Sequence, residues 1–527
     1  MERKFLIGGM LSVGISTPLC AQTEALQQPN IILIMCDDMG FSDIGCYGGE
    51  VKTPNLDKLA ANGLRFSQFK NTGRSCPSRA ALLTGRYQHE VGMGWMAEVD
   101  EHRPGYRGQI QKEYPTIAEI MKANGYTTYM SGKWHVTTTG GYDAPNGSYP
   151  IERGFDRYYG CLHGGGSYYK PDPIYNNLQR VTDVPDDYYY TTAITDSAVS
   201  FIDKHTLEKP MFMYLAHYAP HLPLQAPEKY VKECIERYQV GFDVLRKERF
   251  ERMKNMGIIP KSMEYPVYVK EFNGKQPLWE NLTKEQQKQW VLNMATYAAM
   301  IEIMDEGIGK VMKAIEKKGM MKNTIFLFMS DNGATDEGGY LNQFMSYLSN
   351  TPYRSYKKWC FQGGTSSPLI ITYGNEKKNL RKGEITNQCA HIIDILPTCM
   401  DLGHVYYPTE FQHADLPGVS LVPALYNCKL LKRTLFFEHQ GSSAIIDGDW
   451  KLVRDNRHVA WELINLKEDP FELHDLSKNL PQKVEDMEAR WIEWGITHKV
   501  FPLEDKEWTP RLNFYKAKNP NQTGSAY

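Results

Sequence analysis

The chain has 527 residues, of which 42% are hydrophobic and 23% charged, and its formal net charge is −2. This length and composition are typical of a globular protein with more than one hydrophobic core. The near-neutral charge provides no basic face for nucleic acid and no acidic solvating tail, so we expect no nucleic-acid partner.

The first residues have the pattern of an export signal. Arg3 and Lys4 precede the apolar run 5–15, and small residues follow as far as Ala21. The run is too short to span a bilayer, and no later segment is long and apolar enough to do so. We therefore predict a signal peptide over residues 1–21, an exported protein in the periplasm, and no membrane span. Lipid attachment at Cys20 is the alternative, although the residues before it fit that modification poorly.

The next four hundred residues alternate between strand and helix patterns. Continuous apolar runs at 30–36, 211–216 and 324–329 indicate buried strands. Helices that begin near Pro and end near Gly are expected at 54–63 and 115–125, and a longer helical pattern covers 289–318. This alternation predicts an α/β catalytic domain over residues 28–410, with a doubly wound, mostly parallel sheet flanked by helices.

The last part of the chain changes character. Short strands are expected near 434–438, 443–446 and 450–453, and a helix is expected over 482–494. Residues 411–527 are therefore predicted to form a smaller subdomain, an antiparallel sheet with one helix. The segment 225–285 is rich in Lys and Glu with little strand signal, and we expect a helical insertion there.

Polar residues follow four of the predicted strands, namely those at 30–36, 211–216 and 324–329 and a further one at 126–130. Ligands in open α/β sheets bind beyond the carboxyl ends of the strands, so these residues are expected to meet at one edge. Taken singly, each has a simple explanation as a turn, a helix cap or a structural histidine. The residues concerned are Asp37, Asp38, Lys133, His135, His217, His221, Asp331 and Asn332.

The residue types at this edge indicate an anion site beside a metal ion. The oxygen donors of Asp37, Asp38, Asp331 and Asn332 favour Ca²⁺ or Mg²⁺ over zinc. Cationic side chains beside such an ion would suit a tetrahedral oxyanion, sulfate or phosphate, and would stabilise charge that develops during its transfer. The cations expected here are Arg79, Lys133 and His135.

The stretch "RSCPSR" places two nucleophile types side by side, Ser75 and Cys76. Pro77 suits the first turn of a helix, so Ser75 is expected either to cap that helix or to act as the covalent nucleophile at its positive end. Cysteine is the more reactive side chain at neutral pH, which by itself favours Cys76.

Several motifs together resemble the formylglycine-dependent sulfatases of the alkaline-phosphatase superfamily. They are Ser75-Cys76-Pro77-Ser78-Arg79 with Thr84-Gly85-Arg86, and "NIILIMCDDMG", "GYTTYMSGKWH", "APHLPLQAP" and "SDNG", spread over nearly the whole mature chain. The family's maturation machinery needs proline two residues after its target, which selects Ser75 over Cys76. The resemblance implies that an anaerobic, radical-type enzyme oxidises Ser75 to formylglycine, and that the host is a Gram-negative anaerobe.

The resemblance also implies the role of each site residue. Asp37, Asp38, Asp331, Asn332 and the modified Ser75 would bind one Ca²⁺ ion, and a hydroxyl of the hydrated aldehyde would attack sulfur. Arg79 and Lys133 would hold that diol, and His221 and Lys357 would bind the sulfate and assist the leaving oxygen. His135 would take a proton from the second hydroxyl so that sulfate leaves. Lys357 is placed by its distance from Gln362, where the family usually has Glu.

The expected substrate is a sulfated carbohydrate from a host or algal glycan, with sulfated galactose or N-acetylhexosamine as its sugar. The segment 157–169, rich in aromatic residues and glycine, is either a sugar-binding lid or an ordinary surface loop, and His163 and Arg103 are candidate substrate contacts. Three alternatives stay open: an esterase for aryl or alkyl sulfates, a phosphatase or phosphodiesterase that uses unmodified Ser75, and an inactive glycan-binding protein.

Overall fold

A computed structural model describes residues 28–138, 144–268, 278–374, 380–411, 413, 415–504 and 506–518. The predicted signal peptide and Cys20 lie outside the described residues. Within the described ranges, no helix combines the length and apolar character needed to cross a membrane.

The described strands form two separate sheets. The larger has eleven strands in the order β10-β2-β9-β8-β1-β7-β3-β4-β5-β6, with β11 beside β2, and the smaller has the order β12-β13-β14-β15. The strands are β1 (Asn30–Cys36), β2 (Gly63–Lys70), β3 (Thr127–Gly132), β4 (Arg157–Cys161), β5 (Ile174–Asn176), β6 (Gln179–Val181), β7 (Met211–Ala216), β8 (Thr324–Ser330), β9 (Ser366–Tyr373), β10 (Glu384–Thr386), β11 (Ala390–His391), β12 (Thr434–His439), β13 (Ser442–Asp447), β14 (Trp450–Arg454) and β15 (Glu462–Asn465).

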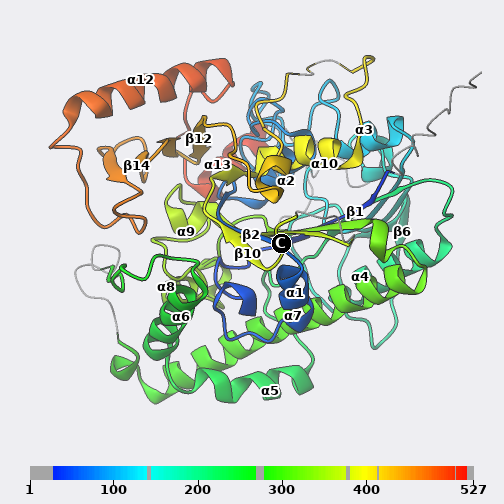
Figure 1. The fold of residues 1–527 in the computed structure, drawn as a ribbon, viewed down its shortest axis with the longest axis horizontal. Helices are drawn as coiled ribbons and strands as arrows, with labels where there is room; N and C mark the ends of the chain where they lie inside the picture. Colours follow the sequence, from blue (N-terminus) through cyan, green and yellow to red (C-terminus); the bar gives the residue numbers. More distant parts are fainter. Residues whose placement is uncertain are drawn as a thin grey trace, which may run out of the picture.

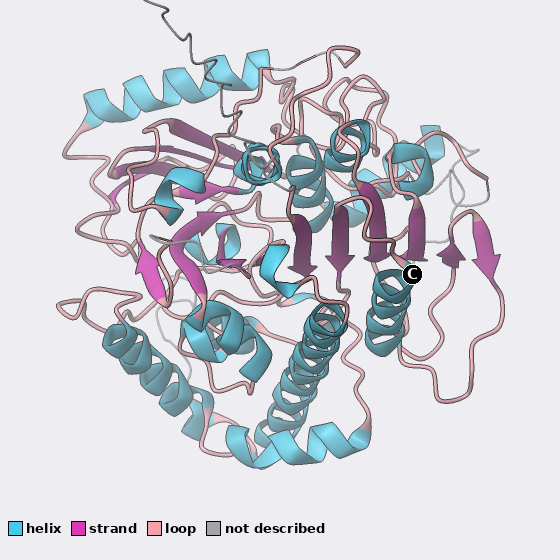
Figure 2. Ribbon diagram, turned by 45° about the vertical axis from the view of Figure 1, so that its right-hand side comes forward, coloured by secondary structure: helices cyan, strands magenta, loops and turns pink. Residues whose placement is uncertain are grey.

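Helices cover both faces of the large sheet (Figure 2). Figure 1 shows α2, α3 and α10 on one side and α1, α4 and α7 on the other. The α-helices are α1 (Pro54–Ala61), α2 (Ser75–Thr84), α3 (Ile117–Ala123), α4 (Tyr190–Lys204), α5 (Glu228–Tyr238), α6 (Phe242–Met256), α7 (Lys284–Lys317), α8 (Gln343–Ser349), α9 (Gln362–Thr365), α10 (Ile395–Gly403), α11 (Val422–Leu425), α12 (Pro481–Thr497) and α13 (Trp508–Lys518).

The sheet separates two hydrophobic cores. Alternate residues of a strand point to opposite faces, so Ile31 and Leu33 of β1 join the core under α2 and α10, while Ile32 and Ile34 join the core under α1 and α7. All seven residues of β1 are buried, as in a central strand covered on both faces. The fold is therefore the predicted α/β class.

The strand register brings the predicted site residues to one edge. Strands β1, β7, β8 and β3 are parallel, and Cys36 pairs with Ser330, so the chain leaves β1 and β8 at the same level. The connection from β8 to β9 stays at this edge of the sheet, so β9 begins where β8 ends and runs antiparallel to it. Strand β2 is antiparallel to β9 and so also ends there, which delivers the segment before Ser75.

The C-terminal part forms the predicted small antiparallel sheet, and α12 packs across it, with Trp491 Nε1 donating to the Phe437 carbonyl at 3.1 Å (Figure 1). Residues of this part, such as Ile445 and Trp491, share a core with the large sheet. The insertion is helical as predicted in α5 and α6, but 257–268 contain no helix, and 269–277 fall outside the described residues. The domain boundary near residue 410 stays a prediction.

Candidate active site

Three carboxylates and one amide meet where β1 and β8 end. Asp37, Asp38, Asp331 and Asn332 are all fully buried. The Asp38 backbone N–H donates to Asp331 Oδ1 at 3.2 Å, and Asn332 Nδ2 donates to Asp38 Oδ1 at 2.7 Å. Asp38 has a φ of 63°, a left-handed conformation that Asp tolerates better than most residues, at the point where the chain turns out of β1.

This oxygen cluster fits a hard divalent cation. Asp37 Oδ1 and Asn332 Oδ1 are buried and accept no hydrogen bond from any described residue. Burial, followed by the nearby charge of Asp37, raises the pKa of Asp331 above its usual range, so a cation beside this carboxylate would favour its ionised form. Oxygen donors of this kind are the preferred ligands of Ca²⁺ and Mg²⁺.

Ser75 lies beside the cluster as the first residue of α2. Arg74 occupies the N-cap position and no side chain caps the helix, so the expectation that Ser75 is the N-cap is wrong. The Ser75 hydroxyl is turned sideways instead: its Oγ accepts a hydrogen bond from Arg79 Nε at 3.0 Å and lies 3.4 Å from His135 Nδ1. Ser75 is thus free of a capping role and held by a cation and an imidazole.

Arg79 and Lys133 connect Ser75 to the carboxylates. Arg79 Nη2 lies 3.0 Å from Asp331 Oδ2 and 3.2 Å from Asp37 Oδ2, and its Nη1 donates to the Lys133 carbonyl at 3.0 Å. Lys133 Nζ forms an ion pair with Asp37 Oδ2. Burial by itself would raise the pKa of Asp37. The charges of Lys133, His221 and Arg79, in that order, nevertheless hold this pKa well below its usual range.

Lys357 and His221 approach the same cluster from the other side. Lys357 Nζ lies 2.8 Å from Asp38 Oδ1, and His221 Nε2 lies 3.7 Å from Asp38 Oδ2. His221 Nδ1 is 2.6 Å from the Leu222 carbonyl, which only accepts hydrogen bonds, so the other ring nitrogen faces the site. The residues predicted from four strand ends therefore converge with Ser75, Arg79 and Lys357.

Two of the remaining sequence candidates take different positions. His163 lies near the site, because Lys133 Nζ contacts the carbonyl of the next residue, Gly164. Burial, and secondly the charge of Lys133, lower the pKa of His163 to about 4. Arg103 binds Glu101 and the Pro502 carbonyl, and the ion pair it forms among the described residues is with Glu101 and not with the cluster, so its contact with substrate stays a prediction.

The aromatic segment 157–169 is partly a strand, because Arg157–Cys161 forms β4 and Tyr168 is fully buried. This part therefore packs rather than offering a mobile lid. His217 packs in the core, with neither ring nitrogen bonded to a described residue.

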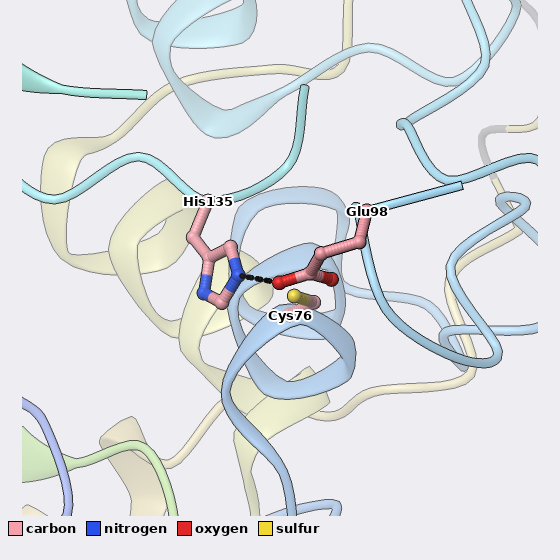
Figure 3. Close-up of side chains that lie close together, drawn as sticks. All are labelled: Cys76, Glu98 and His135. Atoms are coloured by element: carbon pink, nitrogen blue, oxygen red, sulfur yellow. Dashed lines mark hydrogen bonds and ion pairs between the residues drawn. The ribbon is translucent and has the colours of Figure 1, made fainter. Parts of the chain in front are cut away.

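The structure adds residues that sequence reasoning missed. Glu98 and Cys76 lie against His135 on the side away from the carboxylates, and Figure 3 shows the Glu98 carboxylate pointing at the His135 ring. Glu337 forms ion pairs with both Arg74 and Lys357, and its Oε2 lies 3.2 Å from Lys357 Nζ. Glu98 lies in an irregular segment and Glu337 begins the three-residue 3-10 helix η7 (Glu337–Gly339), so no periodicity or strand end signals a site at either.

Fold and site together define a class of protein. A buried serine at a helix N-terminus, flanked by arginine, lysine and histidine and adjoining an oxygen-rich cluster at the edge of an α/β sheet, is typical of hydrolases that act on esters of tetrahedral oxyanions.

Comparison with known proteins gives the family. The family profile described as Sulfatase matches residues 29–405, so the chain belongs to the sulfatase family, whose members hydrolyse sulfate esters. It is 33% identical to an arylsulfatase of Klebsiella aerogenes over 75% of this chain and 91% of that protein. It is 25% identical to an N-acetylglucosamine-6-O-sulfatase of Bacteroides thetaiotaomicron over 88% of this chain and 85% of that protein. The crystal structure of Ps i-CgsB in complex with k-i-k-neocarrahexaose superimposes with a TM-score of 0.68 and 25% identity, covering 95% of this chain and 100% of that one.

Proposed function

We propose that this sulfatase is exported to the periplasm of an anaerobe and removes O-sulfate from a carbohydrate, with Ser75 oxidised to formylglycine by a radical-type maturation enzyme. The observation that carries the proposal is the setting of Ser75, whose buried Oγ meets both Arg79 and His135 beside the carboxylate cluster. A relative named for N-acetylglucosamine-6-sulfate and a neighbour bound to an oligosaccharide support a sulfated sugar, with galactose or N-acetylhexosamine as its sulfated unit.

Two groups complete this site in the proposal. Ca²⁺ held by Asp37, Asp38, Asp331, Asn332 and residue 75 would supply positive charge to the sulfate oxygens. Hydrated formylglycine would supply two hydroxyls, and the first would attack sulfur. The second would then lose its proton, so that the carbon–oxygen bond to sulfate breaks and the aldehyde reforms.

The side chains of this chain then divide the work. Arg79 and Lys133 hold residue 75 and offset negative charge as it develops, since both are buried beside it. Lys357 and His221 face the opposite side of the cluster, where the ester oxygen would leave. Because His221 Nδ1 already donates to the Leu222 carbonyl, His221 would give that oxygen a proton from Nε2 in its doubly protonated form. His135 Nδ1 is the base nearest to residue 75.

A second candidate substrate is an aryl sulfate. The observation in its favour is the 33% identity with a protein named arylsulfatase, higher than the identity with the sugar-specific relative. A phosphatase reaction through unmodified Ser75 is not supported by a second metal set: the other ligand group found among the described residues, Cys76, Glu98 and His135, lacks the oxygen donors of the first.

The test is mass analysis of the peptide that spans residue 75, from protein made in a host that carries the maturation enzyme. We expect a peptide lighter by two hydrogen atoms, and the same change in the Cys76→Ala variant, because the motif is set on Ser75. Release of sulfate from a panel of sulfated monosaccharides and 4-nitrophenyl sulfate then distinguishes sugar from aryl substrates. Unmodified Ser75 in a fully active enzyme would overturn the mechanism, and no sulfate release at all would favour the inactive glycan-binding alternative.

A further inference from the structure

Glu98 lies directly behind His135 as seen from Ser75. His135 Nδ1 is 3.4 Å from Ser75 Oγ, and His135 Nε2 is 3.4 Å from Glu98 Oε1, so the imidazole bridges the hydroxyl and the carboxylate (Figure 3). All three residues are buried, with Glu98 only 4% exposed. Contacts of this length tighten when a catalytic site closes around its substrate.

This arrangement favours one position for the proton on the His135 ring. An ionised carboxylate only accepts hydrogen bonds, so Glu98 favours a hydrogen on Nε2. A neutral imidazole then has its lone pair on Nδ1, the atom that faces Ser75. Carboxylates that contact the far nitrogen of a functional histidine in this way fix both its tautomer and its orientation.

The backbone of His135 holds the ring from the other side. His135 has a φ of 57°, a conformation that non-glycine residues adopt rarely, and its N–H donates to the Leu162 carbonyl at 3.1 Å. The backbone therefore fixes the direction in which the His135 side chain leaves the main chain. The contact with Glu98 then fixes the orientation of the ring and favours one tautomer.

We propose that Glu98 is a positioning residue of the sulfatase reaction, which holds His135 as the Nε2–H tautomer so that Nδ1 is ready to take the proton when sulfate leaves residue 75. The proposal rests on the proposed function of this same site. Glu98 contacts His135 at Nε2, the ring nitrogen that does not face residue 75, and would act on the reaction through that histidine. The part of the reaction it serves is therefore the release of sulfate and not the initial attack on sulfur.

The first readout needs neither activity nor the modification. Protein with unmodified Ser75, made in a host without the maturation enzyme, is labelled with ¹⁵N-histidine, and the ring nitrogens of His135 are assigned by comparison with His135→Ala. We expect an unprotonated Nδ1 and a protonated Nε2 in the wild type and in Glu98→Gln, whose amide oxygen still accepts. In Glu98→Leu we expect a mixture of tautomers, and an unchanged tautomer there would overturn the proposal.

The second readout is turnover of 4-nitrophenyl sulfate by the modified enzyme. We expect kcat to fall roughly 10- to 100-fold in Glu98→Leu and less in Glu98→Gln. KM should fall in parallel, so that kcat/KM is nearly unchanged, because only the second step is slowed. Acid-quenched Glu98→Leu and His135→Ala should retain sulfate on the peptide containing residue 75, because release becomes the slow step. Full turnover in Glu98→Leu would assign Glu98 to packing alone.

Glu101 provides the matched control, because it lies three residues away on the same segment, is 5% exposed, and pairs with Arg511 at 2.6 Å. Glu101→Leu should lower thermal stability without leaving sulfate on residue 75. If the wild-type peptide proves to carry no formylglycine, the proposed function fails, while the tautomer measurement still decides the role of Glu98.

Discussion

Arg79 Nε lies 3.0 Å from Ser75 Oγ, one turn further along the same helix. The other end of the Arg79 guanidinium contacts Asp37 and Asp331, which follow strands far apart in the sequence. A single side chain thus fixes the position of the serine relative to the carboxylate cluster. Such a planar, forked donor set is a property of arginine that lysine does not share.

Replacing Arg79 should therefore damage catalysis even when charge is kept. For Arg79→Lys we expect kcat to fall roughly 10²- to 10³-fold, since one preorganised donor to the reacting group is lost. The measurement is sulfate release, with the mass at residue 75 checked because Arg79 also belongs to the maturation motif. Arg249→Lys is the control, since Arg249 is equally buried and pairs with Asp43 outside the cluster; equal losses in both variants would contradict the prediction.

Removing the metal should reduce both activity and stability. Chelation by EGTA leaves Asp37, Asp38 and Asp331 to repel one another in a buried site, so we expect lost turnover and a lower Tm. A ligand at a hundred times its Kd stabilises the folded state by about 2.7 kcal/mol. Added Ca²⁺ should restore both quantities and Zn²⁺ should not. Full activity in enzyme shown by elemental analysis to be metal-free would be inconsistent with the assigned site.

Glu337 should compete with anions for Lys357 and Arg74. Although burial opposes it, the pKa of Glu337 is held well below its usual range, first by Arg74 and then by Lys357, so the side chain is charged at neutral pH. The side chain is 37% exposed, which limits the worth of these pairs to about 1 kcal/mol.

Glu337→Gln should therefore strengthen inhibition by inorganic sulfate up to about fivefold. The measurement is the inhibition constant for sulfate against turnover. Glu228→Gln, which removes a fully exposed partner of Lys232, serves as the control and should leave that constant unchanged. Weaker inhibition in Glu337→Gln would show that this carboxylate assists anion binding.

Lys70 should make the stability of the protein depend on pH in alkaline solution. Burial lowers the pKa of its ammonium from 10.5 to about 8, and its Nζ contacts the neutral Gln362 Oε1 at 2.7 Å and Ser366 Oγ at 2.9 Å. Between these two pKa values the unfolded chain binds more protons than the folded one, so the contribution of Lys70 to stability rises with pH.

Lys70→Met removes that contribution. Relative to wild type, its free energy of unfolding in urea should be larger at pH 8 than at pH 10.5 by about 3 kcal/mol, meaning a more stable variant at pH 8. Lys288→Met, at an exposed position of α7, is the control and should show no such trend. If the difference in free energy of unfolding between Lys70→Met and wild type does not change from pH 8 to pH 10.5, burial does not lower the pKa of Lys70 and the prediction is wrong.

The central elements could be predicted because their signals are local. The apolar runs 30–36 and 211–216 form β1 and β7 with the predicted bounds, since a strand covered on both faces needs an unbroken run of apolar residues. The edge strands β5 and β6 and the last helix α13 were not foreseen. They are short or polar, and their place depends on neighbours that are distant in the sequence.

The sequence by itself determined the fold class and the strand ends that carry Asp37, Asp331 and Lys133, because each depends on residue type and spacing along the chain. The preference for Ser75 over Cys76 is what the family resemblance implies. Only the tertiary structure decided that Ser75 bonds to Arg79 rather than capping α2, that Arg103 binds Glu101 and the Pro502 carbonyl, and that Glu98 stands behind His135. The physical reason is that contacts between irregular segments are set by the register of strands and the packing of helices around them, which leaves no periodic trace in the sequence.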